Sequence, residues 1–137
     1  DSMGVVHIFQ NGKVNTISNM TKGWSAVRFD IGVAYKENLT KVMEVIQQVG
    51  DEMYAEEAYK TNMLASVEVS GLNNFGDSAL EIRARIRTKP GKQWGIGREF
   101  RKRLKESFDE HNIEIPFPHQ TIYWGDDMHP AKLVENK

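Results

Sequence analysis

Hydrophobic and polar residues alternate most regularly over residues 76–89, which read GDSALEIRARIRTK. The apolar side of the alternation consists of Leu80, Ile82, Ala84 and Ile86, and the charged side consists of Glu81, Arg83, Arg85 and Arg87. Because side chains of a β-strand point alternately to the two faces of a sheet, the pattern predicts a strand with one buried and one charged face. The partner of the charged face is the question that the sequence raises: water, a nucleic acid or another copy of the chain.

Two further segments alternate in the same way. Residues 25–35 predict a strand that turns Arg28 and Asp30 outward and buries Val27, Phe29, Ile31 and Val33. Residues 65–72 predict a second strand, with Ala65, Val67 and Val69 on its apolar side. The turn-forming residues 73–77 (NNFGD) follow it, so we expect this strand and the arginine-containing strand to form an antiparallel hairpin.

Two segments instead show the spacing of three and four residues that is typical of amphipathic helices. The first follows Asn38, a favourable N-cap residue, and its apolar side consists of Leu39, Val42, Met43, Ile46, Val49 and Met53. The second is predicted over residues 93–111, after the strand-breaking Pro90-Gly91, and its apolar side consists of Ile96, Phe100, Leu104 and Phe108.

Short β-prone runs lie at both ends of the chain. Residues 5–9 and 13–18 flank Asn11-Gly12, a dipeptide that favours tight turns, and they predict a hairpin that needs other strands for stability. Pro116 and Pro118 favour an extended entry into a final strand over residues 121–124.

The predicted order is strand, helix, strand, strand, helix, strand. This is the split βαβ arrangement of a ferredoxin-like α+β sandwich, with both helices on one face of a four-stranded sheet. The fold-class prediction is therefore α+β, a ferredoxin-like βαββαβ domain over residues 25–125. It is preceded by the hairpin in residues 1–24 and followed by a polar tail, residues 126–137. The topology leaves the sheet face that carries the arginines without helices.

Composition narrows the function classes. A chain of 137 residues with 39% hydrophobic and 27% charged residues is typical of one soluble globular domain, and a net charge of -1 argues against a general polyanion binder. The absence of cysteine excludes disulfides and thiolate metal sites and fits a reducing compartment best. There is no apolar run of membrane-spanning length and no leader, and the chain begins with Asp1-Ser2-Met3, so we expect a piece of a longer protein.

No motif in the sequence indicates a catalytic site, a metal site or a cofactor site. The histidines, His7, His111, His119 and His129, lack the i, i+4 spacing of helical metal ligands. The acidic residues lie in polar contexts, and no nucleophile motif is present, so the prediction is a protein that is not an enzyme. Gly95 and Gly97 precede a helix without the rest of a dinucleotide fingerprint, which favours a simple helix-entry turn over a phosphate site.

The densest charge feature is basic: Arg83, Arg85, Arg87, Lys89, Lys92, Arg98, Arg101, Lys102, Arg103 and Lys105. An open βαββαβ sheet with a basic face is similar to RNA-recognition folds, but those stack bases on aromatic side chains, where this chain has Glu81 and arginines. An RNA- or small-ligand-binding module therefore stays an alternative, and so does a plain solvated face.

Four stretches, in this order and spacing, resemble one family, the bacterial mechanosensitive channels of small conductance. They are QNGKVNTISNMT near the beginning, VRFDIGVAYKENLTKVMEVI with its Val-Ala-Tyr, GDSALEIRARI, and IPFPHQTIYW. Phe9-Gln10 stands before Asn11-Gly12 where the family usually has Ile/Val-Pro. Together the stretches cover residues 5–124, and agreement at several levels is what makes such a signal specific.

The resemblance implies a homoheptamer, anchored in the bacterial inner membrane by transmembrane helices that precede this chain. On this reading residues 1–24 are the end of the channel's middle β-domain, and the chain lies on the cytoplasmic side. There it lines a hollow vestibule, supports assembly and filters the solutes and ions that reach the pore, with no cofactor and no nucleic acid. Candidate subunit-interface or vestibule-lining residues are Asn11, Gly12, Asn19, Arg83, Arg85 and Arg87.

Overall fold

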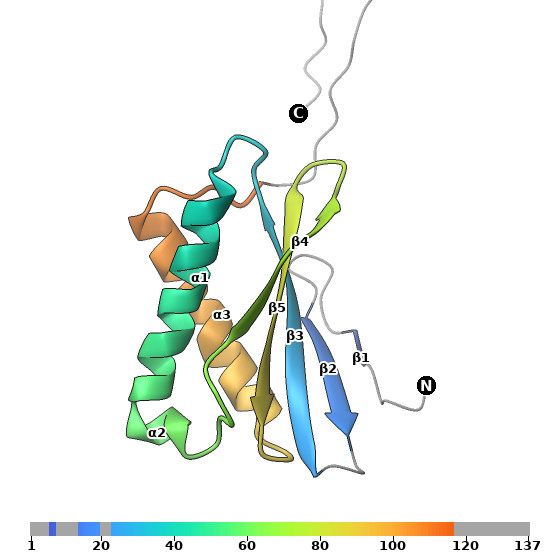
Figure 1. Ribbon diagram of the computed structural model, residues 1–137, viewed down its shortest axis with the longest axis vertical. Helices are drawn as coiled ribbons and strands as arrows, with labels where there is room; N and C mark the ends of the chain where they lie inside the picture. Colours follow the sequence, from blue (N-terminus) through green and yellow to red (C-terminus); the bar gives the residue numbers. More distant parts are fainter. Residues whose placement is uncertain (1–5, 8–13, 20–22, 117–137) are drawn as a thin grey trace, which may run out of the picture.

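The sheet and its helices form two layers in the computed structural model, which describes residues 6–7, 14–19 and 23–116 (Figure 1). The elements are β1 (Val6–His7), β2 (Val14–Asn19), β3 (Trp24–Val33), α1 (Leu39–Ala55), α2 (Glu57–Lys60), β4 (Glu68–Phe75), β5 (Leu80–Thr88) and α3 (Gln93–Glu110). All strand pairs are antiparallel, in the order β1-β2-β3-β5-β4. The long helices α1 and α3 cover the same sheet face, so the predicted α+β class is confirmed.

Strands β3 and β5 form the centre of the sheet and pair along their length, from Ser25 opposite Thr88 to Val33 opposite Leu80. The alternation predicted for both is confirmed. On the helix side, Ile82 and Ile86 of β5 are fully buried, and Phe29 of β3 is 1% exposed. This apolar side packs against α1 and α3 in one continuous hydrophobic core.

Both long helices begin near the predicted residues. The Asn38 side chain caps α1, because its Oδ1 accepts a hydrogen bond from the Lys41 backbone N–H at 2.9 Å. Helix α3 starts at Gln93 after a turn in which Gly91 has a φ of +84°, a backbone conformation that favours glycine. The four apolar residues predicted for its buried side, Ile96, Phe100, Leu104 and Phe108, are all buried.

Strand β4 begins and ends about three residues later than the sequence pattern indicates. It has no described partner on its outer edge, and its register with β5 shifts between Val69 and Gly71 and again between Leu72 and Asn74. Such bulges absorb extra residues and are common in edge strands. Residues 73–75, predicted as a turn, therefore belong to the strand. The tight turn follows it, closed by a hydrogen bond from Gly76 N to Ala79 O.

The predicted N-terminal hairpin pairing is confirmed by β1 and β2, with Val6 opposite Thr16 and His7 opposite Asn15. Strand β2 also pairs with β3, from Val14 opposite Phe29 to Asn19 opposite Trp24, so the hairpin joins the main sheet. The predicted turn at Asn11-Gly12 and the predicted final strand, 121–124, lie outside the described residues. The complete ferredoxin-like arrangement consequently stays a prediction.

An ion pair fastens the end of α1 to α3. The Arg103 guanidinium contacts both carboxylate oxygens of Glu56, at 2.6 and 2.8 Å, and its Nε donates to Glu99 at 2.7 Å. It also lies 5.2 Å from the centre of the Tyr59 ring. The hydrogen bond from Arg103 lowers the pKa of Glu56, which keeps this carboxylate charged in the folded chain.

Helix α1 approaches the segment before β4 most closely at Gly50, which is buried. A Cβ added at this position would overlap Cγ1 of Val67 and lie 2.7 Å from its Cβ. The absence of a side chain at Gly50 therefore sets the distance between the helix and this segment.

We expect Gly50→Ala to destabilise the chain by roughly 1–3 kcal/mol, the usual cost of overpacking, although alanine favours a helix by about 1 kcal/mol over glycine. The matched control is Gly95→Ala in α3, where an added Cβ has no atom within 4 Å. Gly95→Ala should leave the free energy of unfolding unchanged or raise it slightly. Urea unfolding midpoints measure both, and equal midpoints for the two variants would contradict the close contact.

Candidate functional site: the outer face of the sheet

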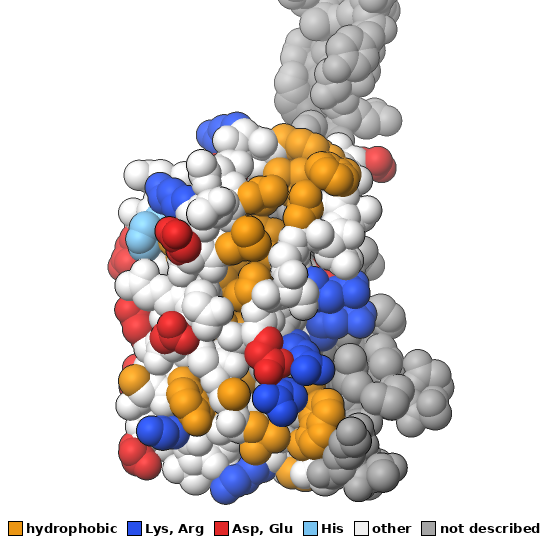
Figure 2. Space-filling model, viewed as in Figure 1, with side chains coloured by type: hydrophobic (Ala, Val, Ile, Leu, Met, Phe, Trp, Pro, Cys, Tyr) orange, Lys and Arg blue, Asp and Glu red, His pale blue; other side chains and the backbone are white. Residues whose placement is uncertain are grey.

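The candidate site lies on the sheet face that α1 and α3 leave uncovered, which we call the outer face. Its side chains come from the alternate positions of three strands: Trp24, Ala26, Arg28 and Asp30 of β3, Glu68 of β4, and Glu81, Arg83, Arg85 and Arg87 of β5. Strand pairing places Asp30 opposite Arg83, and it places both Arg28 and Glu68 opposite Arg85. Figure 2 shows blue Lys and Arg side chains gathered around a red acidic one over the sheet.

The three predicted arginines are brought together on this face, but they do not form an unpaired basic row. Arg83 Nε contacts Asp30 Oδ1 at 3.0 Å, and Asp30 is only 8% exposed. Glu68 forms ion pairs with the other two arginines. Arg85 Nε lies 2.6 Å from Glu68 Oε1, and Arg87 Nη2 lies 3.0 Å from Glu68 Oε2. Carboxylates from β3 and β4 thus neutralise much of the charge that the β5 sequence suggests.

The environment of Glu68 keeps it ionised. Burial raises the pKa of this carboxyl group, but the hydrogen bonds and charges of Arg85 and Arg87 outweigh burial and leave the pKa below its ordinary value. Glu68 is partly exposed, so each ion pair contributes modestly to the free energy of unfolding. Its main effect is to hold two guanidinium groups in fixed positions between β4 and β5.

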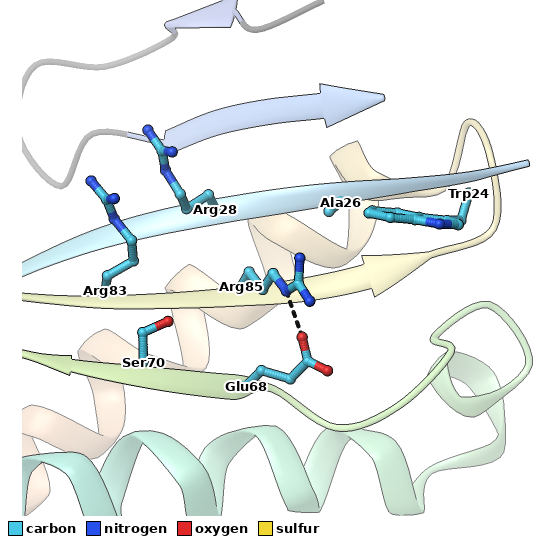
Figure 3. Close-up of a pocket in the computed structure, with 7 residues that line it drawn as sticks. All are labelled: Trp24, Ala26, Arg28, Glu68, Ser70, Arg83 and Arg85. Atoms are coloured by element: carbon cyan, nitrogen blue, oxygen red, sulfur yellow. Dashed lines mark hydrogen bonds and ion pairs between the residues drawn. The ribbon is translucent and has the colours of Figure 1, made fainter. Parts of the chain in front are cut away.

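Arg28 lies on the same face, although the sequence pattern does not mark it as a candidate site residue. Within the described part of the chain its side chain has no hydrogen bond or ion pair, and its Nε is buried without a partner. It lines an open depression of about 660 Å³ together with Trp24, Ala26, Glu68, Ser70, Arg83 and Arg85 (Figure 3). Its outward position follows from the strand alternation, but its lack of a carboxylate depends on pairing that sequence reasoning could not supply.

The remaining predicted site residues lie in the N-terminal part. Asn19 is the last residue of β2 and stands opposite Trp24 in the sheet, whereas Asn11 and Gly12 lie outside the described residues. Contacts of any of these residues with another subunit or with vestibule water stay predictions. The Gly95 and Gly97 pair lies inside the first turns of α3, where Gly97 faces Val27 of β3.

A search of residues 6–7, 14–19 and 23–116 finds no group of three or more His, Cys, Asp or Glu that could hold a metal ion. In the same part of the chain, every helix is too short or too polar to cross a membrane.

Comparison with known proteins identifies the family. Residues 27–115, which run from β3 to the segment after α3, match the family model "Mechanosensitive ion channel MscS, C-terminal". This match covers well over half of the chain, so the chain belongs to the MscS family of mechanosensitive ion channels, a channel family rather than an enzyme family.

Individual relatives agree with this assignment. The small-conductance mechanosensitive channel of Caldanaerobacter subterraneus subsp. tengcongensis is 28% identical over 117 residues, which are 85% of this chain and 40% of the relative. An uncharacterized MscS family protein of Archaeoglobus fulgidus is 21% identical over 121 residues, 88% of this chain and 40% of the relative. The chain thus spans about 40% of the length of these curated relatives.

A solved structure supports the fold. The crystal structure of Helicobacter pylori MscS in its closed state superimposes with a TM-score of 0.63 at 23% identity, over 84% of this chain and 43% of that one. The resemblance stated from sequence motifs alone is therefore confirmed at the level of the family.

We expect Glu68→Gln to lower the free energy of unfolding at neutral pH by up to about 1 kcal/mol, because two arginines lose their charged partner at a partly exposed site. The folded-state pKa of Glu68 lies below the ordinary value of 4.5, so its stabilisation is complete above pH 4.5 and is lost as the pH falls through the lowered pKa. The difference in the free energy of unfolding between the variant and the wild type should therefore become smaller in acid.

The control is Glu106→Gln, which removes an exposed carboxylate paired with Lys102 on α3 and should change stability by less than about 0.5 kcal/mol. Urea unfolding at a series of pH values measures both variants. A Glu68→Gln effect that is constant down to pH 3 would contradict the assignment of the lowered pKa to the two arginines.

Proposed function

We propose that this chain is the cytoplasmic vestibule domain of a mechanosensitive ion channel. The observation that carries the proposal is the family match over residues 27–115, because that range includes the strands and helices of the main domain. The relative from Caldanaerobacter subterraneus, which carries the name of a small-conductance mechanosensitive channel, supports the same role. The transmembrane helices would be encoded outside these residues and would anchor the domain at the bacterial inner membrane.

The proposed assembly is a homoheptamer in which these domains surround a water-filled vestibule. Residues 1–24 would complete the middle β-domain, residues 25–125 the ferredoxin-like domain with its final strand at 121–124, and residues 126–137 a tail. In a force-gated channel the membrane part senses tension, and the soluble part couples to it through subunit contacts. No catalytic step is required for this role, and we propose that the chain is not an enzyme.

The outer face is proposed to contribute to solute filtering. Its arginines exceed its carboxylates, since Arg28 has no acidic partner in the described part of the chain. A small positive excess on a vestibule wall enriches anions and repels cations over about one Debye length, ~8 Å at physiological salt. Asn11, Gly12 and Asn19 are proposed to lie at a subunit contact near the middle β-domain.

The comparisons do not favour the alternative of an independent RNA- or small-ligand-binding module. The family model is that of a mechanosensitive ion channel, and the relative from Caldanaerobacter subterraneus is named as a small-conductance mechanosensitive channel. No observation on the described residues favours RNA binding over the channel role.

The test is electrical and uses the full-length channel in membrane patches under suction. We expect tension-gated currents from the wild type. In a salt gradient we expect the combined variant Arg83→Gln, Arg85→Gln and Arg87→Gln to move the reversal potential toward the equilibrium potential of the cation. Glutamine removes the charge without placing a like charge beside Asp30 and Glu68. The control variant, Lys36→Gln, Lys41→Gln and Lys60→Gln combined, removes the same charge from α1, α2 and the loop before α1, and it should leave the reversal potential unchanged.

Two results would count against parts of the proposal. If the membrane-inserted wild-type protein passes no current under tension, the channel role is wrong. If currents are normal and the arginine variant has the reversal potential of the lysine variant, the outer face takes no part in filtering. Crosslinking of the same membranes reports whether seven subunits assemble in each variant.

A further inference from the structure

Arg28 is an unusual residue for the middle of a sheet because two other arginines lie beside it on β5. It stands directly opposite Arg85 on β5, and Arg83 lies two residues along the same strand and face. Like charges directly opposite one another in a sheet are destabilising. The nearby carboxylates, Asp30 and Glu68, are already bonded to Arg83, Arg85 and Arg87.

In the described part of the chain two guanidinium Nε atoms of this face are buried without a partner, and of these Arg28 Nε lies at the depression whereas Arg87 does not line it. Arg28 makes no hydrogen bond within the described part of the chain, and Arg83 uses only its Nε, which donates to Asp30. A guanidinium has five N–H donors in a fixed planar arrangement that suits carboxylate and phosphate oxygens. Figure 3 shows the Arg28 and Arg83 side chains extending to the same side, away from Glu68.

The surface beside these two arginines is hollowed. Ala26 lies between Arg28 and Trp24 on the outward positions of β3, and its small side chain leaves room above the strand. The Trp24 ring stands at the other end of the depression, 6.0 Å from the Arg85 guanidinium. The depression therefore combines a cationic end with an aromatic end.

We propose that this depression binds a small organic anion, with its carboxylate or phosphate group held by Arg28 and Arg83 and its planar or apolar part lying against Trp24 over Ala26. The anion would neutralise the charge excess around Arg28 and supply the acceptor that its buried Nε lacks. Arg83 and Arg85 are already fixed by their ion pairs, so the site needs little ordering when the anion binds. The proposal does not depend on the channel role.

The experiment is a titration of the 137-residue chain with phenyl phosphate, followed by ¹H–¹⁵N NMR, including the Arg28 Nε–H signal. We expect saturable binding with a dissociation constant of about 1 mM or below, a value that a small anion reaches with a few charge-assisted bonds. Benzoate tests the carboxylate alternative, and inorganic phosphate tests the contribution of the ring. Phenyl phosphate should bind more tightly than inorganic phosphate.

Three variants locate the site. Arg28→Gln should weaken phenyl phosphate binding about tenfold, the effect of one lost charge-assisted hydrogen bond. Trp24→Leu should weaken the binding of phenyl phosphate by about threefold or more and leave the binding of inorganic phosphate unchanged. Arg98→Gln, which removes an exposed charge from α3 on the opposite layer, should change binding by less than about twofold because salt screens it.

Thermal midpoints separate loss of binding from loss of folding. Arg28→Gln should unfold at the wild-type temperature or above, because it removes like-charge repulsion. Equal binding by Arg28→Gln and Arg98→Gln would overturn the proposal, as would no saturation of the wild type below about 10 mM phenyl phosphate. An Arg28 Nε–H shift that follows protein concentration without added anion would also overturn it, since a second copy of the chain would then fill the depression.

Discussion

The two-faced alternation of β5 is the constraint on which the rest of the structure depends. This strand lies between β3 and β4, with Ile82, Ala84 and Ile86 fully buried beneath the helices and three arginines on the opposite face. A slip of one residue would turn the arginines into the core, where an unpaired charge is very costly. The alternation therefore excludes slips of an odd number of residues from the observed register with both neighbouring strands. That register in turn determines which carboxylate meets which arginine on the outer face.

Most of the described main domain could be predicted from the sequence because its patterns are long and regular. Helices α1 and α3 repeat their apolar residues over several turns, β3 and β5 alternate over most of their length, and Asn38 signals the start of α1. The limits of β4 could not be predicted in the same way. Asn73 and Asn74 favour turns locally, but pairing with β5 keeps them in a bulged edge strand.

The candidate site was predictable as a face but not as a set of contacts. The alternation places Arg83, Arg85 and Arg87 on one side of β5, but the neighbours of a strand depend on register, which local sequence does not contain. Asp30 and Glu68 are separated from these arginines by many residues in the chain and appear in the sequence only as polar positions of other strands. The depression at Arg28 and Trp24 could not be predicted for the same reason.

The same register separates two kinds of arginine on the outer face. Arg83, Arg85 and Arg87 each bond a carboxylate on a neighbouring strand, and such bonds across strands favour the observed pairing. Within the described residues Arg28 makes no such bond and stands opposite a like charge, so the pairing seen there gives no reason for its charge. A residue that opposes local stability indicates a functional position, and the proposed anion would give Arg28 such a function. The paired arginines then do more than connect strands: they hold two walls of the depression in place, and the unpaired one supplies the charge that attracts an anion into it.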